Sequence, residues 1–413
     1  MGGTHETLTH GMDGGARQQA KPPLWTRNFV LISLANLLVF LGFQMLMPTL
    51  PLYVAKLGGQ ASAIGIVVGV FTISAVAMRP LVGVGLDRWG RMGFLFLGLG
   101  VFILSVLSYN LAGAIPVLLG LRLVHGFGWG AYTTSSGTIA ADVIPAARRG
   151  EGMGYYGLSG NLAMAVAPVL GLFIANRYGF GSLFWTSATL AFLAIFLAAG
   201  IRLQAANNTA ITVGAAIPGG AGGQAPRGKT AFFERSALLP SLVVLLVTIT
   251  YGGVVTFVTL FAAQRGIRNV GAFFTVFAVV LMATRPFAGV LADKRGFRTV
   301  LIPGLLMVGA GMLTLGLAGN LAGLFLAAAL YGIGFGAVQP TLQALTVQLA
   351  PPARRGVANA TFFSAFDLGI SLGSIFLGLV AQWIGYGGMY AVSALFALLG
   401  LAMFSWLEKA EKS

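Results

Sequence analysis

The chain has 413 residues, of which 57% are hydrophobic and 8% are charged, and its formal net charge is +15. A soluble domain of this size carries roughly 25% charged residues, so this chain cannot cover its surface with charge and is predicted to be solvated by lipid. Because it contains no cysteine, disulfides, thiolate metal sites and cysteine nucleophiles are excluded.

The predicted elements are twelve apolar runs, each long enough to cross a bilayer as a helix. A spanning helix needs about 20 mostly apolar residues and satisfies its backbone polar groups internally. The alternating ten-residue segments typical of a membrane barrel do not occur. In chain order the runs are 28–55, 62–86, 92–110, 115–141, 153–176, 181–201, 237–264, 270–291, 299–318, 321–349, 357–384 and 387–407.

Polar segments separate these runs into two halves of six. Residues 1–27 form a polar tail without the apolar core of a cleavable signal peptide, so the first span is expected to act as an uncleaved insertion signal. Residues 202–236 are rich in Gly, Ala, Pro and Asn and are predicted to be a flexible cytoplasmic linker. The other predicted domains are an N-terminal half over 28–201, a C-terminal half over 237–407 and a C-terminal tail over 408–413.

Lysine and arginine outside the spans gather on one side of the predicted membrane. With both termini in the cytoplasm, 18 of these residues lie in cytoplasmic segments and 4 lie in outer segments. Basic segments stay in the cytoplasm during insertion, so this asymmetry predicts a multi-pass protein of the cell membrane with both termini inside. The net charge is therefore a signal of topology and of contact with anionic lipid, not of nucleic-acid binding.

The two halves carry the same landmarks at one constant offset. RPLVGVGLDRWGRM (79–92) aligns without gaps with RPFAGVLADKRGFR (285–298), an offset of 206. The same offset aligns VHGFGWGA (124–131) with LYGIGFGA and AARRG (146–150) with PARRG. This pattern indicates an internal duplication of parallel topology, as in transporters built from two six-span halves.

On these residues the chain resembles the major facilitator superfamily over essentially its full length. The stretch 83–91 is similar to that superfamily's signature between spans 2 and 3, and LGFQMLMPTLP (41–51) is similar to the first-span pattern of its twelve-span drug:proton antiporter branch. Arg122 and Gly126 resemble the fourth-span signature, with His125 where glutamine is usual. The glycine pattern of span 5 is similar to the antiporter signature, but this chain has alanine at two positions where the signature has glycine. The resemblance implies alternating-access transport without a cofactor.

The duplicated loop is the candidate for a conformational latch. Positive residues such as Arg88 and Arg91 are explained by topology alone, but Asp87 is not, because acidic residues contribute little to orientation. The resemblance implies that Asp87 faces a helix N-terminus of the other half near Gly356 and holds the cytoplasmic side closed. The candidate latch residues are Gly83, Asp87, Arg88, Gly90, Arg91, Gly289, Asp293 and Gly296.

Span 4 carries a polar face inside the predicted membrane. Arg122, His125, Trp129, Tyr132 and Ser136 follow 3-4-3-4 spacing and therefore share one side of the helix. Intramembrane polar residues face protein or water rather than lipid, which predicts the wall of a central cavity. The alternative is a network of hydrogen bonds that only holds helices together.

Span 11 carries Asp367, the only carboxylate in the middle of a predicted span. Ser364, Ser371 and Ser374 share its face, and Asn161 occupies the equivalent position of the first half. Three roles are open for Asp367: proton coupling, recognition of a cationic substrate, and a structural ion pair, for example with Arg122. The proton-coupling candidates are Asp367, His125 and Arg122.

Further polar residues of spans 1, 7 and 10 complete the predicted cavity. Span 1 offers amides instead of the acidic residue that polyspecific antiporters of this branch often carry, so coupling is expected at Asp367 or His125. The predicted substrate cavity comprises Asn36, Gln44, Arg122, His125, Trp129, Tyr132, Asn161, Tyr251, Gln339, Gln343 and Asp367.

The predicted function is proton-coupled efflux of a small organic molecule, drug-like, amphipathic or cationic, by a monomer that is not an enzyme. The match GQAPRGKT (223–230) to a phosphate-loop pattern lacks a preceding strand, so no nucleotide site is expected. No metal or other cofactor is expected. The alternatives are a specific metabolite exporter or a proton-coupled importer on the same fold and, more remotely, a membrane-embedded enzyme or a passive channel.

Overall fold

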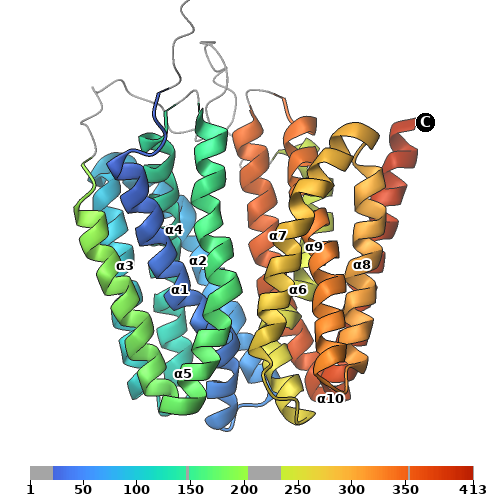
Figure 1. Ribbon diagram of the computed structural model, residues 1–413, viewed down its shortest axis with the longest axis horizontal. Helices are drawn as coiled ribbons and strands as arrows, with labels where there is room; N and C mark the ends of the chain where they lie inside the picture. Colours follow the sequence, from blue (N-terminus) through green and yellow to red (C-terminus); the bar gives the residue numbers. More distant parts are fainter. Residues whose placement is uncertain (1–21, 146–147, 203–233, 352–353, 413) are drawn as a thin grey trace, which may run out of the picture.

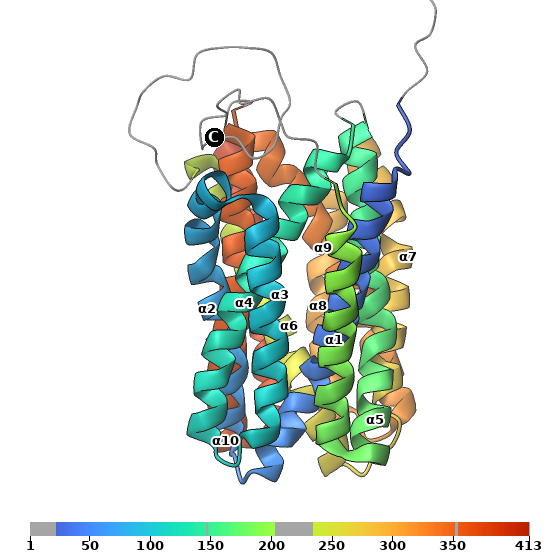
Figure 2. The same ribbon diagram turned by 90° about the vertical axis from the view of Figure 1, so that its left-hand side faces the viewer.

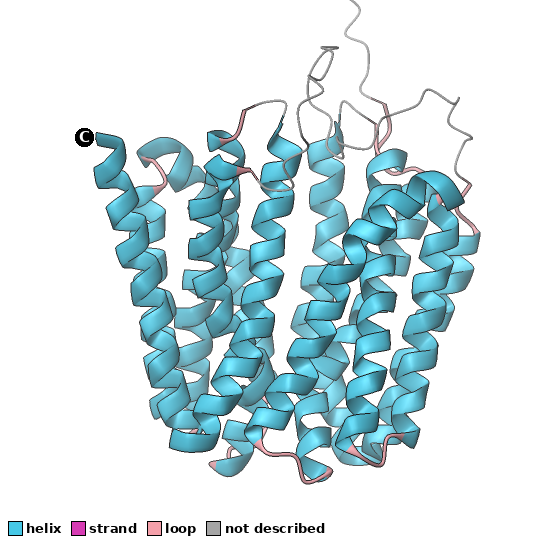
Figure 3. Ribbon diagram, turned by 180° about the vertical axis from the view of Figure 1, so that it is seen from behind, coloured by secondary structure: helices cyan, strands magenta, loops and turns pink. Residues whose placement is uncertain are grey.

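The structure is a computed structural model that describes residues 22–145, 148–202, 234–351 and 354–412. Every regular element in these ranges is a helix (Figure 3). The first half contains α1 (Arg27–Lys56), α2 (Ala61–Trp89), α3 (Arg91–Ser108), the short η1 (Tyr109–Leu111), α4 (Ile115–Val143) and α5 (Arg149–Ala199). The second half contains the short η3 (Arg235–Ala237), α6 (Leu238–Gln264), α7 (Gly271–Arg295), α8 (Arg298–Leu317), α9 (Leu321–Leu349) and α10 (Arg355–Lys412).

Helices α5 and α10 each consist of two limbs joined at one glycine. Gly179 has φ 85° and ψ 168°, and Gly385 has φ 73° and ψ 170°, which is backbone that only glycine adopts readily. The two limbs of each helix fold back at these turns (Figure 1). A continuous helix of 51 or 58 residues would exceed roughly 75 Å in length, more than twice the hydrocarbon core of a bilayer.

The outer surface of the bundle is apolar. Among the described residues, nine helical stretches are long and apolar enough to cross a membrane. Large hydrophobic side chains such as Leu111, Leu317 and Trp383 are more than four-fifths exposed. A surface of this kind is stable when lipid covers it, which agrees with the composition.

The helices form two bundles, α1–α5 and α6–α10 (Figures 1 and 2). Helix α5 ends and η3 begins at one end of the molecule, which we call the linker end, and the turns inside α5 and α10 lie at the opposite, far end (Figures 1 and 2). The bundles meet through α2 with α10, α5 with α7 and α1 with α6. Small residues allow α2 and α10 to approach closely, and Ser371 Oγ donates to the carbonyl of Gly69 at 3.0 Å.

Hydrogen bonds between the two bundles concentrate toward the far end. Thr259 Oγ1 donates to the carbonyl of Pro48 at 3.0 Å, and Gln382 donates to Gln60 at 2.7 Å. Thr275 of α7 adds a bond to α5. Among the described residues, the polar contact between bundles that lies closest to the linker end is the Arg79–Asp367 ion pair. The far end is therefore closed.

Candidate functional site

A cavity of about 420 Å³ lies between the two bundles. This volume is in the range of sites for small organic molecules. Seven helices contribute to it, from both halves of the chain. Its lining consists of Asn36, Phe40, Gln44, Thr133, Tyr156, Gly157, Gly160, Asn161, Met164, Tyr251, Leu281, Arg285, Phe335, Gln339, Phe363 and Phe366.

The wall formed by the first half is held in place by a hydrogen-bond network around Asn36. Its amide donates to Ser159 Oγ at 2.7 Å, and its carbonyl accepts from Tyr156 OH at 3.0 Å. Tyr132 OH donates to the same carbonyl at 3.4 Å, and Ser136 bonds Tyr156 at 2.7 Å. The polar groups of α1, α4 and α5 are thus oriented before any substrate enters.

The wall formed by the second half is aromatic. The rings of Tyr251 and Phe335 are stacked with centroids 5.0 Å apart, and Phe366 lies 6.2 Å from Phe335. Phe363 follows at 6.4 Å from Phe366. Aromatic faces of this kind bind flat or apolar parts of a ligand.

Arg285 is the only charged side chain in the described lining. Its Nη2 donates to Gln339 Oε1 at 3.2 Å, and its Nε is buried without a hydrogen-bond partner among the described residues. Gln339 in turn bonds Gln343, which bonds Asn359. The cavity therefore carries a positive charge whose described hydrogen bond goes to one neutral amide.

Asp367 lies outside this lining and forms an ion pair with Arg79 across the interface between α2 and α10. The side chains are 17% and 35% exposed, respectively. The suggested pairing of Asp367 with Arg122 is wrong, because Arg79 occupies the carboxylate. The neighbouring Ser371 and Ser374 bond α2 and α6, so this polar face of α10 packs against helices. A cationic substrate would find no carboxylate in the described lining.

The polar face of α4 packs inside the first half, away from the cavity lining. Arg122 is 1% exposed, donates from Nε to the carbonyl of Val67 at 3.1 Å and lies 4.1 Å from the ring centroid of Phe71. His125 is fully buried, and its Nδ1 lies 2.7 Å from Tyr109 OH. The Arg122–His125 part of this face corresponds to the alternative of an internal network, whereas Tyr132 and Ser136 of the same face bond α1 and α5 behind the cavity wall.

Of the eleven predicted cavity residues, the structure brings five into the lining: Asn36, Gln44, Asn161, Tyr251 and Gln339. Two more lie one hydrogen bond behind it, Tyr132 on Asn36 and Gln343 on Gln339. Trp129 stacks on Phe43 at 3.9 Å and, with Arg122, His125 and Asp367, lies outside. Sequence reasoning missed Tyr156 and Arg285, although the duplicated Arg-Pro pair already identified Arg285 as a cation within a span.

Glycines form the turns in both copies of the candidate latch. Gly90 has φ 82° and Gly296 has φ 81°, so the duplicated turn has the same left-handed backbone in both halves. Arg91 pairs with Asp142 at the end of α4, within the first half. Among the second copies, Gly289 and Asp293 are exposed. Gly83, Asp87 and Arg88 lie outside the residues whose side chains the structure describes, so the predicted contact of Asp87 with a helix N-terminus stays a prediction.

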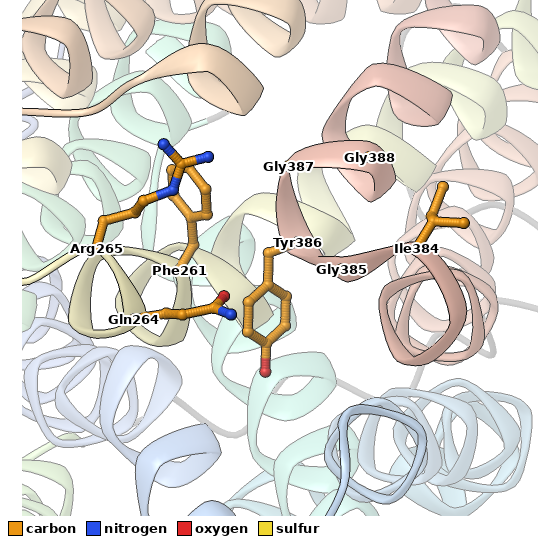
Figure 4. A pocket seen from close by; sticks show the side chains of 8 residues that line it. All are labelled: Phe261, Gln264, Arg265, Ile384, Gly385, Tyr386, Gly387 and Gly388. Carbon is orange, nitrogen blue, oxygen red and sulfur yellow. The ribbon is translucent and has the colours of Figure 1, made fainter.

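A second pocket of about 410 Å³ lies at the far end, around the Gly385 turn (Figure 4). Arg265 lies along one side of it with its guanidinium 5.2 Å from the ring centroid of Phe261. Ile384, Tyr386 and two further glycines complete the opposite side. This pocket draws its lining from α6 and α10 alone, whereas the central cavity joins the two halves. We therefore assign the candidate site to the central cavity.

Titratable side chains do not converge on a metal-binding arrangement in the part of the chain that the structure describes. The central cavity offers amides, hydroxyls, aromatic rings and one guanidinium. These groups can bind and orient a small molecule, but they lack the paired acid and base of a hydrolytic site. Its chemistry is that of recognition.

Comparisons of the chain with family models and with curated proteins indicate the same family, and comparison with solved structures indicates a similar fold. Residues 32–273 and 242–413 match the family model described as Major Facilitator Superfamily. An uncharacterised MFS-type transporter of Methanocaldococcus jannaschii is 23% identical over 395 residues, covering 93% of this chain and 99% of the relative. The staphylopine export protein of Staphylococcus aureus is 25% identical over 404 residues, covering 92% and 96%. The crystal structure of the nucleoside transporter NupG has a similar fold, with a TM-score of 0.72 at 14% identity, covering 92% of this chain and 99% of that one.

Proposed function

The chain belongs to the major facilitator superfamily, and on this premise we propose that it exports a small organic molecule in exchange for protons. It is a multi-pass membrane transporter, and the members of this superfamily are typically non-enzymatic. The observation that carries the proposal is the central cavity, lined by both halves of a duplicated chain. A site at the interface of two repeats is the arrangement that alternating access requires.

We propose twelve membrane crossings with both termini in the cytoplasm. The two-limbed helices α5 and α10 support this number, since each limb is long enough to cross. Helix α4 counts as a crossing because its polar face is buried against neighbouring helices. The excess of basic residues on the linker side supports the orientation.

In this orientation the structure corresponds to a cytoplasm-facing state. The far end is held together by hydrogen bonds between the bundles, such as Thr259 to Pro48. The cavity residues Asn36, Tyr156 and Phe363 lie within the first ten residues of the linker-end portions of their helices. Opening toward the outside then requires the far-end contacts to break.

We propose that Asp367 couples this change to protons. Its pairing with Arg79 links α2 to α10, and protonation of the carboxylate would remove the charge that holds the pair. Protonation of Asp367 would therefore weaken this contact between the two bundles. The antiporter-like motifs of spans 1 and 5 and the name of the staphylococcal relative support export. A specific metabolite exporter and a proton-coupled importer remain the alternatives on this fold.

The test is transport in proteoliposomes that contain the purified chain and a pH-sensitive dye. Candidate substrates are added with and without an imposed pH gradient, and both substrate movement and proton flux are recorded. We expect substrate movement to follow the gradient and to carry protons in the opposite direction. Substrate movement that does not depend on the pH gradient would refute proton coupling. Proton flux in the same direction as the substrate would identify a proton-coupled importer.

A further inference from the structure

We infer that the cavity takes an organic anion, whose acidic group pairs with Arg285 and whose apolar body lies against the aromatic wall. This inference rests on the proposed function and names the substrate class of the same site. It follows from the way the two halves of the duplicated chain differ at one pair of positions.

The duplication relates two arginines and their facing positions. Arg79 and Arg285 are equivalent at the offset of 206, and so are Asn161 and Asp367. In the structure α2 packs on α10, and the equivalent helices α7 and α5 pack on each other. The Arg79–Asp367 ion pair therefore has a counterpart, Arg285 with Asn161, in which an amide replaces the carboxylate.

Arg285 and Asn161 both belong to the cavity lining, whereas Arg79 and Asp367 lie outside the described lining. An amide cannot neutralise a guanidinium, and the only hydrogen bond described for Arg285 goes to the neutral Gln339. Its Nε is buried and has no partner among the described residues. A bound carboxylate would supply the missing charge and accept from this N–H, and guanidinium groups bind carboxylates in such a two-point geometry.

The charge of the described lining reinforces the preference for an anion. The described lining contains no carboxylate that would offset Arg285. In a site of low dielectric a cationic ligand would be repelled, whereas an anionic ligand would be attracted.

The remaining walls determine what the rest of the anion can be. The second half presents the stacked rings of Tyr251 and Phe335, and Phe366 packs edge-to-face against Phe335. Asn36 and Tyr156 present oriented polar groups from the first half. The volume of about 420 Å³ fits one small aromatic acid with polar substituents.

The experiment measures binding to the purified full chain in lipid nanodiscs by calorimetry, with three probes that share one ring system. These are 2-naphthoate, the neutral 2-naphthamide and the cationic 2-naphthylmethylamine. We expect naphthoate to bind at least about 10-fold more tightly than either of the others, as for a charge-assisted contact. Asn161→Asp should abolish this preference, because it places beside Arg285 the carboxylate that the equivalent Arg79–Asp367 pair has.

Matched variants separate charge from shape. Asn161→Ser removes the amide without adding charge and should keep the preference for the acid. Arg285→Gln should abolish the preference and Arg285→Lys should keep part of it, while Arg265→Gln, at the second pocket, should change nothing. A thermal unfolding transition like that of the unmodified chain shows that Asn161→Asp is folded.

The inference is overturned if the amine or the amide binds as tightly as the acid, if none of the probes binds, or if Asn161→Asp retains the preference. These outcomes differ from failure of the proposed function. Gradient-driven transport of a neutral or cationic compound, without binding of the acid, would support the proposed exporter and refute an anionic substrate. Binding of naphthoate without gradient-dependent movement of any anion would support the anion site and refute the proposed proton-coupled export.

Discussion

Replacing Asp367 with asparagine should shift the protein away from the state with a closed far end. The carboxylate pairs with Arg79 and joins α2 of one half to α10 of the other. The amide keeps the shape of the side chain but leaves the arginine without its counter-charge. This state then loses one of the contacts that join the two bundles.

The size of the shift follows from the exposure of the pair. Breaking a fully buried ion pair costs about 3–5 kcal/mol, and an exposed pair contributes about 0–1 kcal/mol. Asp367 is 17% exposed and Arg79 is 35% exposed, so this pair lies between the two cases. We expect a loss of about 1–2 kcal/mol, which changes the ratio of the two conformations by about 5- to 30-fold.

The assay is the distribution of distances between pairs of spin labels. Because the chain has no cysteine, labels go only where cysteine is introduced. Leu111 and Leu317 are both 82% exposed and report on the far end. Gly93 and Thr299 are exposed near the linker end. Asp367→Asn should raise the population at long far-end distances and lower it at long linker-end distances.

Two further variants identify the ion pair as the cause. Asp142→Asn breaks the Arg91–Asp142 pair, which has similar exposure but lies within one half, and it should not move the far-end distances. Exchanging the charges, with Arg79→Asp and Asp367→Arg together, should restore the distribution of the unmodified protein. Identical far-end distributions for Asp367→Asn and the unmodified protein would refute the reasoning.

Three other predictions concern coupling and stability. Asp367→Asn should flatten the pH dependence of transport in proteoliposomes, because an amide does not titrate; an unchanged profile would exclude Asp367 from coupling. Gly90→Ala should lower the free energy of unfolding by about 1–3 kcal/mol, measured by thermal unfolding, because Gly90 has φ 82° and ψ 149°. Gly93→Ala, within α3, should not lower it, because an added Cβ would meet no other atom within 4 Å. Asn36→Leu should cost about 1–3 kcal/mol, since Tyr156 OH and Ser159 lose a buried partner, and Asn110→Leu at an exposed position should cost less.

Much of the fold was predictable because membrane helices leave a strong signal in composition. Apolar runs, basic segments and turns at Gly90 and Gly296 are local features, and the duplication repeats them at one offset. Five polar residues of spans 1, 5, 7 and 10 line the central cavity, and their role in binding substrate stays a prediction: Asn36, Gln44, Asn161, Tyr251 and Gln339.

The predictions for charged and strongly polar residues were less complete, for a physical reason. Spacing places Arg122 and His125 on one face of a helix, but it does not say whether that face meets a neighbouring helix or the cavity. The structure packs this face against α2 and α3. Likewise, Asp367 could be singled out by its charge, but its partner could not, because Arg79 is 288 residues away in sequence.

The sequence by itself determined the class of protein, the two equivalent halves and the positions at which they differ, since these properties depend on composition and on alignment of the chain with itself. Only the tertiary structure decided that Arg79 pairs with Asp367, while the described lining offers Arg285 no counter-charge. Charge balance is a property of the side chains that meet in space, and residues from distant parts of the chain meet only when the helices pack.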